Sequence, residues 1–335
     1  MPSLDPAIAE VRRAVRAALG SLPDGATVLV ALSGGADSLA LTAATVFEAR
    51  ARDMTVLSLT VDHQLQQGSD MAAASAAVAA EGIGVHDALQ TKVSVIRDGE
   101  GIEAAARESR YAAIGGIARA ECAAAVLLGH TLDDQAETVL LGLARGSGAA
   151  SLQGMAPVRT SDDGMLWMRP LLGVRRETTR RFCEASGIEV WNDPHNLDTR
   201  YARVRTRERV LPVLEAELGP GIAEALARTA EQLREDAAAF EEMIHETIED
   251  IVEHAEAGIA VSVAALAANP AALRNRIIRL VVDSEFGVSL TRSQTLEVAR
   301  LVTDWSGQGP IDLPGCRATR SGARIVFTAS GNAIV

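Results

Sequence analysis

The stretch from Val28 to Leu41 constrains the fold of this 335-residue chain more than any other. An apolar run of strand length stops at Ser33-Gly34-Gly35, and apolar residues then resume at helical spacing. The glycines therefore lie in a strand-to-helix turn, where the backbone can approach a ligand closely. Unpaired N–H groups and the dipole of the following helix favour an anion, and the hydroxyls of Ser33 and Ser38 add donors. The turn is predicted to bind phosphate.

Asp37 stands out in this turn, because a carboxylate repels phosphate unless a cation lies between them. Its presence predicts magnesium, a hard cation that oxygen ligands bind. The turn has neither the lysine of the G-x-x-x-x-G-K-[ST] loop nor the G-x-G-x-x-G pattern. An ordinary tight turn with serine and aspartate as helix caps would be the better interpretation of Ser-Gly-Gly alone, but six matched positions after a β-branched strand favour a nucleotide site. Residues 33–38 resemble the S-G-G-x-D-S loop of the ATP pyrophosphatase family, whose members cleave ATP between the α and β phosphates.

The composition predicts a soluble, globular chain, with 48% hydrophobic and 23% charged residues. The segment from Met1 to Gly20 mixes acids and arginines among alanines, which is typical of neither a secretory signal nor a membrane anchor. No stretch approaches the roughly 20 apolar residues that span a bilayer. We therefore expect a cytoplasmic protein with no membrane partner. Cys122, Cys183 and Cys316 form no C-x-x-C pair, which favours packed thiols over a disulfide, zinc or iron–sulfur site.

The net charge of −12 argues against a general affinity for nucleic acids, since positive charge drives phosphate binding. The segment from Arg159 to Arg209 is different, with eleven arginines against eight acids. Its net charge is +3, which leaves −15 for the remaining residues. Such a segment is compatible with an RNA-facing patch and equally with a solvated helix face.

Predicted strands and helices alternate through the first half of the chain. Strands are expected at 27–32, 54–61, 85–89 and 124–128. Helices are expected at 7–19, 37–50, 70–81 and 102–120. This rhythm is typical of an α/β fold with a doubly wound parallel sheet. Ligands of such sheets bind beyond the carboxyl ends of the strands, where Ser33, Asp62-His63 and Gly129-His130 would gather.

A second informative stretch runs from Gly129 to Gly148. Thr131 is a helix-cap candidate with Asp134 three residues later. Asp133, Asp134 and Glu137 share one face of the predicted helix, because residues three and four positions apart are neighbours. Acids in a first helical turn complement the helix dipole, but three of them beside a phosphate turn exceed what capping requires.

Several segments together resemble the tRNA(Ile)-lysidine synthetase family, a branch of the ATP pyrophosphatases. The second signature of that family matches His130-Thr131-Leu132-Asp133-Asp134-Gln135-Ala136-Glu137. Further matches are 61–65, 103–111, 145–148, 169–172, 191–198 and 203–207. The resemblance covers residues 25–215 and implies a sheet of the adenine-nucleotide α-hydrolase-like type. Four residues depart from the family pattern: Gln66, His195, Val204 and Thr206.

The resemblance implies a two-step reaction on the wobble cytidine of tRNA(Ile) with a CAU anticodon. ATP would activate the C2 oxygen of cytosine as an adenylate with loss of pyrophosphate. Free L-lysine would then displace AMP, which gives lysidine. The target base must enter the pocket unstacked. The lysine amine, with an unperturbed pKa of about 10.4, must lose a proton, and the spacing does not tell which acid receives it.

The resemblance also implies roles for individual residues. Asp37, Asp134 and Glu137 are the expected catalytic residues, and Asp37 and Asp134 would carry Mg²⁺. Asp133 and Glu137 would bind the lysine. The expected ATP-binding residues are Ser33, Gly34, Gly35, Ala36, Asp37, Ser38, His63 and His130. The expected tRNA-binding residues are Arg110, Arg145, Arg175, Arg203 and Arg207.

Three segments are expected along the chain. Residues 1–215 would form the catalytic PP-loop ATP-binding domain, and residues 216–260 are helical and acidic and would form a linker. Residues 261–335 are predicted to form a small α+β domain, with a helix that carries Arg274, Arg276 and Arg279, and with short antiparallel strands within 311–328. This segment resembles the compact tRNA-contacting module of shorter family members. The sequence does not specify the oligomeric state, and a homodimer is one option.

Three other functions share parts of these patterns. A tRNA thiolation enzyme has the same loop but needs cysteines or an iron–sulfur cluster. An amidotransferase such as a GMP or NAD synthetase also activates its substrate with ATP, but this chain has no recognisable glutaminase segment. A nucleotide-sensing stress protein would bind ATP without turnover and would have no use for Asp133, Asp134 and Glu137.

Overall fold

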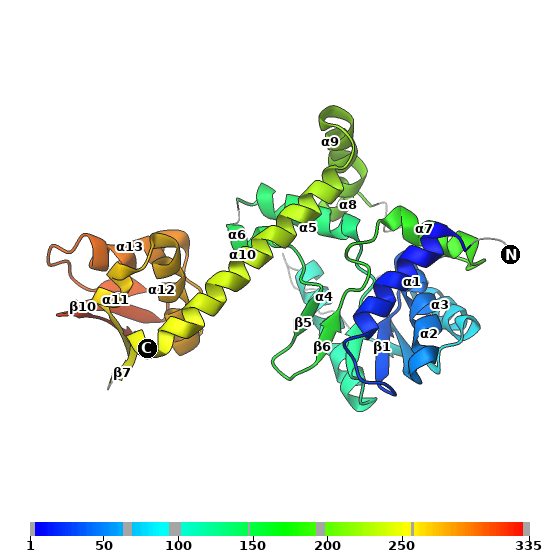
Figure 1. Ribbon diagram of the computed structural model, residues 1–335, viewed down its shortest axis with the longest axis horizontal. Helices are drawn as coiled ribbons and strands as arrows, with labels where there is room; N and C mark the ends of the chain where they lie inside the picture. Colours follow the sequence, from blue (N-terminus) through cyan, green and yellow to red (C-terminus); the bar gives the residue numbers. More distant parts are fainter. Residues whose placement is uncertain are drawn as a thin grey trace. The chain divides into compact units, whose positions relative to one another are not determined.

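The computed structural model describes residues 4–62, 69–93, 102–146, 148–191, 198–255 and 258–330. The chain forms two compact units, Met1–Arg234 and Glu235–Val335 (Figure 1). Each unit has its own sheet and its own buried core. Among the described helices, none combines the length and the apolar character that a bilayer crossing requires.

The first unit is built on a six-stranded sheet in the order β3-β2-β1-β4-β6-β5. Its strands are β1 (Thr27–Ala31), β2 (Thr55–Asp62), β3 (Asp87–Lys92), β4 (Ala125–Leu127), β5 (Val158–Thr160) and β6 (Leu166–Met168). In the described sheet, neighbours pair in parallel except for β5, which is antiparallel to β6. The predicted doubly wound parallel sheet is confirmed. The strand expected at 85–89 starts at Asp87 instead, and β5 and β6 extend the sheet beyond the prediction.

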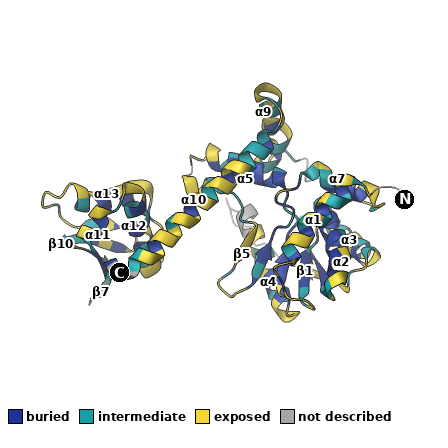
Figure 2. Cartoon of the chain, in the orientation of Figure 1, coloured by how far each residue is buried: buried dark blue, intermediate teal, exposed yellow. Residues whose placement is uncertain are grey.

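Helices cover both faces of this sheet, because successive residues of a strand point to opposite sides. On one face, Val28 and Val30 pack with α1 (Pro6–Leu19), α2 (Ala36–Ala49), α3 (Ser69–Ile83) and α7 (Arg176–Ala185). On the other face, Leu29 packs in a cluster with α4 (Ile102–Ala120) and Trp167. Figure 2 shows the buried layer that results along β1. The turns that follow β1 and β4 lie at the carboxyl ends of these strands.

A second group of helices completes the first unit. α5 (Leu132–Ala144) follows β4, and α6 (Ala149–Leu152) follows α5. α8 (Ala202–Arg205), the π-helical turn η3 (Thr206–Val210) and α9 (Leu211–Leu218) form one run. Leu211 of this run is buried together with Leu132 and Ala136 of α5. The packing brings the arginines of α8 and η3 to the side of α5.

α10 (Ile222–Ile251) is one helix of 30 residues, where the sequence predicts one long helix or two. Its buried positions recur every seven residues and are Ala223, Ala230, Ala237, Ile244 and Ile251. The helix therefore buries one edge, which partly buried residues such as Leu226 and Phe240 flank, and exposes much of the opposite side. The boundary between the two units falls within α10, after Arg234. The segment boundaries expected at 215 and 260 stay a prediction.

The second unit has a five-stranded antiparallel sheet in the order β7-β8-β11-β10-β9. Its strands are β7 (Val252–Ala255), β8 (Gly258–Ser262), β9 (Ile311–Leu313), β10 (Cys316–Ser321) and β11 (Arg324–Ala329). Its further helices are α11 (Val263–Ala268), α12 (Ala271–Phe286) and α13 (Arg292–Thr303). Phe327, Ile277 and Leu266 are fully buried between the helices and the sheet. The predicted small α+β domain is confirmed as a fold.

Candidate active site

The turn between β1 and α2 is ordered by its own serines. Ser38 Oγ accepts a hydrogen bond from the Ser33 N–H at 3.1 Å and donates to the Gly35 carbonyl at 2.9 Å. Gly34 has a φ of +80°, a left-handed conformation that an L side chain rarely adopts. Gly35 is the N-cap residue of α2, and as a glycine it has no side chain that could accept hydrogen bonds from the first N–H groups of the helix. The first N–H groups of α2 are therefore available to an anion, as the sequence predicts.

The turn after β4 lies directly against this turn. A Cβ atom on Gly129 would lie 3.2 Å from the backbone of Asp37 and Ser38, so a larger residue would push the two turns apart by a few tenths of an ångström. His130 follows, and its Nδ1 is buried with no hydrogen-bond partner among the described residues. Burial lowers the pKa of His130 below its usual range, so the imidazole is neutral at physiological pH. A neutral ring with a free nitrogen beside the turn can contact a bound nucleotide.

Four carboxylates form what we call the acidic group: Asp37 of α2 and Asp133, Asp134 and Glu137 of α5. The side chain of Arg176, the first residue of α7, lies at its centre. Arg176 Nε is 3.3 Å from Asp37, Nη2 is 2.8 Å from Asp134 and Nη1 is 3.1 Å from Glu137. The structure thus brings together the acids that the sequence predicts, and it adds a guanidinium that the sequence did not single out.

Hydrogen bonds hold these carboxylates in place. Asp134 Oδ2 accepts from both the N–H and the hydroxyl of Thr131, each at 2.8 Å, in the predicted capping interaction. Asp133 Oδ2 accepts from the Arg176 N–H at 2.7 Å and so caps α7 from outside. Thr179 donates to Asp37 Oδ1. Thr179 was not expected from the sequence, and its contact fixes α7 over the start of α2.

Glu137 has no exposed surface. Its Oε1 accepts from Arg207 Nε at 2.7 Å and from Arg176 Nη1 at 3.1 Å. Its Oε2 accepts from Arg207 Nη2 at 3.1 Å, and Arg203 Nε lies 3.9 Å away. Because a buried charge is costly unless it is paired, these arginines are what makes a carboxylate tolerable here.

The environment shifts the pKa values of the neighbouring carboxyl groups of Asp37 and Asp134 in opposite directions. Burial raises the pKa of Asp37 above its ordinary value, despite the hydrogen bond from Thr179 and the charge of Arg176. Burial also acts to raise the pKa of Asp134, but the charge of Arg176 and the hydrogen bonds from Thr131 outweigh it and hold that pKa low. Such divergent environments are typical of functional sites.

Comparison with known proteins identifies the family. The family described as "PP-loop domain" matches residues 9–214, and "TilS substrate binding domain" matches residues 262–326. The chain is 57% identical to the tRNA(Ile)-lysidine synthase of Leifsonia xyli subsp. xyli over 307 residues, which are 91% of each chain. The chain belongs to the tRNA(Ile)-lysidine synthase family. The enzyme of the same name from Nocardia farcinica is 50% identical, again over 91% of each chain.

A solved structure supports the fold. The U34-tRNA thiolase NcsA from Methanococcus maripaludis, solved with its [4Fe-4S] cluster, matches with a TM-score of 0.56. The match covers 68% of this chain and 80% of that chain, at 19% identity. At this identity the likeness concerns the fold alone. Membership of the tRNA(Ile)-lysidine synthase family favours ligation over the thiolation and amidotransferase alternatives, and it is consistent with ATP use at the PP-loop turn.

The acidic group offers a place for a divalent cation, although the described residues contain no ready cluster of three or more His, Cys, Asp or Glu ligands. Asp37 and Asp134 both face the guanidinium of Arg176, which stands where one cation can meet two carboxylates. Two carboxylates with phosphate and water oxygens are a donor set that suits Mg²⁺. The residues therefore fit the ion on the condition that the guanidinium gives way.

The arginines expected to bind tRNA fall into two sets. Arg175, Arg203 and Arg207 face the acidic group, and Arg175 pairs with Asp133 at 3.5 Å. Arg110 is half-buried on α4, with its guanidinium 5.9 Å from the ring of Tyr111, and Arg145 is exposed at the end of α5. The structure thus gathers three of the five at the acidic group, and Arg145 is the most open to a large ligand.

Two departures from the family pattern can be located. Val204 and Thr206 are buried, and the Thr206 hydroxyl bonds the Ala202 carbonyl at 3.0 Å. They therefore pack inside the helical run, while Arg203 and Arg207 point to the acidic group. Gln66, His195 and the predicted ATP contact His63 lie outside the described residues.

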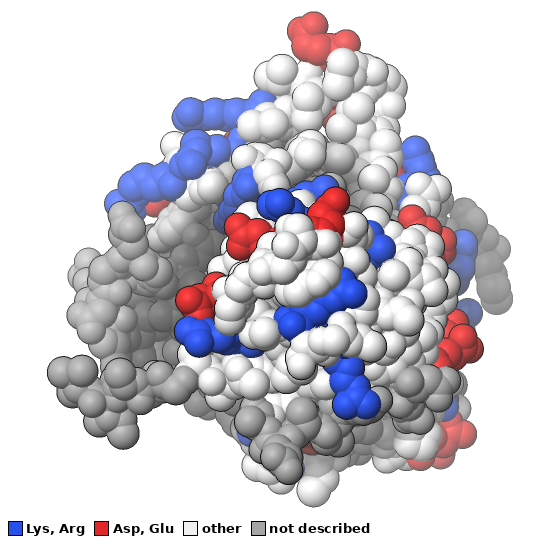
Figure 3. Space-filling view, turned by 90° about the vertical axis from the view of Figure 1, so that its left-hand side faces the viewer, with Lys and Arg blue, Asp and Glu red and all other residues white. Residues whose placement is uncertain are grey.

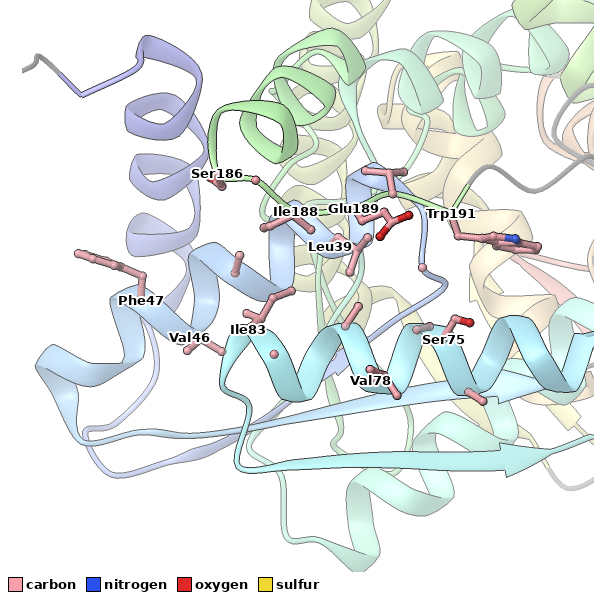
Figure 4. Close-up of a pocket in the computed structure, with 18 of the residues that line it drawn as sticks. Leu39, Val46, Phe47, Ser75, Val78, Ile83, Ser186, Ile188, Glu189 and Trp191 are labelled. Carbon is pink, nitrogen blue, oxygen red and sulfur yellow. The ribbon is translucent and has the colours of Figure 1, made fainter.

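Two cavities of the first unit lie in different places. A cavity of about 950 Å³ lies between α2, α3 and the segment 186–191, with Phe47 at one end and Trp191 at the other (Figure 4). Gly34 touches its wall, but none of the four acids lines it. A smaller cavity of about 180 Å³ is lined by Asp133, Glu137, Arg175, Arg176 and Arg207. The smaller cavity therefore adjoins the acidic group.

The second unit carries basic residues that serve partly in its own packing. Arg274 Nη1 donates to the Asn269 carbonyl at 3.2 Å, and the guanidinium of Arg276 lies 4.2 Å from the centre of the Phe240 ring. On the face drawn in Figure 3, basic side chains occur at several places with acidic ones among them. This mixture does not by itself mark an RNA-binding patch.

Proposed function

We propose that this chain is an ATP-dependent ligase that joins L-lysine to C2 of the wobble cytidine of tRNA(Ile) with a CAU anticodon. The reaction would pass through an adenylated cytidine and release pyrophosphate and AMP. One observation carries the proposal. In this chain, which belongs to the tRNA(Ile)-lysidine synthase family, the turn of residues 33–38 lies beside the buried acidic group. The protein would act in the cytoplasm, and the proposal holds for a monomer as for a homodimer.

ATP is proposed to bind at the turn of residues 33–38 and at His130. The uncapped N–H groups at the start of α2 would face the leaving pyrophosphate and stabilise the charge that develops on it. Mg²⁺, held by Asp37 and Asp134, would supply further charge neutralisation on the phosphates. His63 is included among the ATP contacts on the strength of the sequence motif alone.

L-lysine is proposed to bind at Asp133 and Glu137. The amine has to lose its proton before it attacks, which a nearby carboxylate or desolvation would favour. Both oxygens of Glu137 already accept hydrogen bonds from Arg176 or Arg207. Because Glu137 also has no exposed surface, the lysine ammonium reaches it only if a neighbouring side chain moves.

The tRNA is proposed to contact Arg110, Arg145, Arg175, Arg203 and Arg207. The match to a substrate-binding domain at residues 262–326 supports a tRNA-contacting role for residues 261–335. Residues 1–215 would then be the catalytic domain and residues 216–260 the linker. A base buried in a stack cannot react, so the wobble cytidine must be unstacked to reach the acidic group.

The test is transfer of labelled L-lysine into an unmodified tRNA(Ile) transcript with a CAU anticodon, in the presence of ATP and Mg²⁺. We expect incorporation that requires ATP and is lost in Asp37→Ala. A transcript with a CAU anticodon from a methionine tRNA is the control for tRNA identity. No incorporation by folded protein that binds ATP would rule out lysidine synthesis.

A further inference from the structure

Arg176 covers the oxygens that a cation would need. Asp134 has one oxygen, Oδ2, bonded twice to Thr131, which leaves Oδ1, and Arg176 Nη2 lies 2.8 Å from that atom. Asp37 has Oδ1 bonded to Thr179, which leaves Oδ2, and Arg176 Nε lies 3.3 Å from that atom. The guanidinium of Arg176 thus contacts the remaining oxygen of both carboxylates, while Arg207 Nη2 lies farther from the same Asp134 oxygen, at 3.6 Å.

The position of Arg176 is fixed by more than these ion pairs. Its backbone N–H bonds Asp133, and its side chain is 13% exposed. The neighbouring Arg175 is different, because its side chain is 38% exposed and pairs with Asp133 and Glu224 and not with Asp37, Asp134 or Glu137. Of these two adjacent arginines, only Arg176 reaches the oxygens in question.

We propose that Arg176 is an internal counter-ion that occupies the cation position between Asp37 and Asp134 and withdraws when a divalent cation binds. This inference rests on the metal pair of the proposed function. Magnesium needs ligand oxygens at about 2.0–2.1 Å, and a guanidinium on the same oxygens repels the ion. Arg176 is in this sense a positioning residue: it holds both carboxylates in place and keeps the free enzyme from binding metal tightly.

The direction of the effect follows from competition. A cation that binds the free enzyme must displace the guanidinium, so part of its binding free energy is lost. The phosphates of a bound nucleotide would offer the guanidinium another anion, since arginine binds phosphate as it binds carboxylate. Metal binding would therefore be weak without nucleotide and would depend on ATP.

The test is the affinity of the full chain for Mn²⁺ without nucleotide, lysine or tRNA, measured from the electron paramagnetic resonance signal of free Mn²⁺. Arg176→Met keeps an unbranched apolar stem but removes the guanidinium and its charge, and we expect it to bind Mn²⁺ at least tenfold more tightly than wild type. The same variant should melt below wild type in EDTA and regain more of its melting temperature when Mg²⁺ is added. Arg180→Met, which removes an exposed charge of α7 that pairs with Glu177 at 4.0 Å, is the matched control and should bind Mn²⁺ as wild type does.

Equal or weaker Mn²⁺ binding by Arg176→Met would overturn the inference, because the guanidinium would then not compete with the cation. If that variant does not fold, Arg176→Lys keeps a charge but loses the fork that reaches both acids, and several-fold tighter binding is expected. Unchanged Mn²⁺ binding by Arg176→Lys would also overturn the inference. The Mn²⁺ measurement uses neither tRNA nor lysine. Failure of the wild-type enzyme to make lysidine would therefore refute the proposed function, while the comparison of Mn²⁺ affinities between wild type and variant would still test the role of Arg176.

Discussion

Glu137 is a carboxyl group without exposed surface that faces two guanidinium groups within hydrogen-bond distance. Asp134, one turn earlier on α5, is fixed by Thr131 and Arg176. At the scale of single residues the site is therefore a network of paired charges in a poorly solvated place. Such a network is sensitive to the loss of any one partner, because the remaining charge stays buried.

Glu137→Gln tests this network. The change keeps the shape of the side chain but removes the negative partner of Arg207 and Arg176. We expect the free energy of unfolding to fall by about 3–5 kcal/mol, which urea denaturation followed by circular dichroism would measure. Asp312→Asn, which breaks the exposed pair with Arg317, is the control and should leave the midpoint unchanged. A fully stable Glu137→Gln would show that the arginines do not depend on this charge.

At the scale of elements, the site is the meeting point of three helix starts. α2 begins at the phosphate turn, α5 begins after β4, and α7 begins at Arg176. The parallel sheet explains the first two, because its strands end at one edge. α7 joins them because it packs on α2 in the same core, with Phe182 and Cys183 buried among the residues of α2.

Gly34→Ala tests the geometry of the phosphate turn. An alanine at φ +80° is strained by about 1–2 kcal/mol, and its Cβ would lie 3.3 Å from Ala76. We expect a loss of stability of that size and at least tenfold weaker binding of an ATP analogue, measured by calorimetry. Gly25→Ala carries similar strain at φ +74° with no atom within 4 Å, and it should lose stability but keep nucleotide affinity. Equal nucleotide affinity in both variants would contradict a phosphate role for the turn.

At the scale of the whole molecule, the chain is two units with separate cores. The nucleotide turn and the acidic group belong to Met1–Arg234, and the match to a substrate-binding domain belongs to Glu235–Val335. Damage to one core should therefore leave the other unit folded. We therefore expect nucleotide binding by the first unit to persist when the second unit, which carries part of the proposed tRNA contacts, is damaged.

Phe327→Ala in the full chain tests this separation. Phe327 is fully buried in the core of the second unit, and its truncation should cost that unit about 3–5 kcal/mol. We expect weaker binding of tRNA(Ile) in a filter assay and unchanged affinity for an ATP analogue. Thr328→Ala, on the other face of β11, is the control and should change neither. Loss of both affinities in Phe327→Ala would mean that the units do not fold independently.

The comparison of prediction and structure is clearest at α5. Thr131, Asp134 and Glu137 could be placed on one helix from spacing alone, and the capping interaction is present. The strand at 85–89 was misplaced, because β3 (Asp87–Lys92) is an edge strand with little buried surface and a weak apolar pattern. β5 and β6 are not predicted by the sequence pattern, because β5 is exposed at all three positions and β6 lacks the longer apolar run that surrounds β4.

The sequence by itself determined the parallel sheet, the phosphate turn and the acids of α5, because these follow from short-range periodicity and from residue types within a few positions of one another. Only the tertiary structure decided that Arg176 and Thr179 contact Asp37, from 139 and 142 residues away. Nothing local separates Arg176 from Arg175 in an arginine-rich stretch. The difference arises when α7 packs against α2 and α5, which turns one arginine into the buried site and leaves its neighbour half exposed.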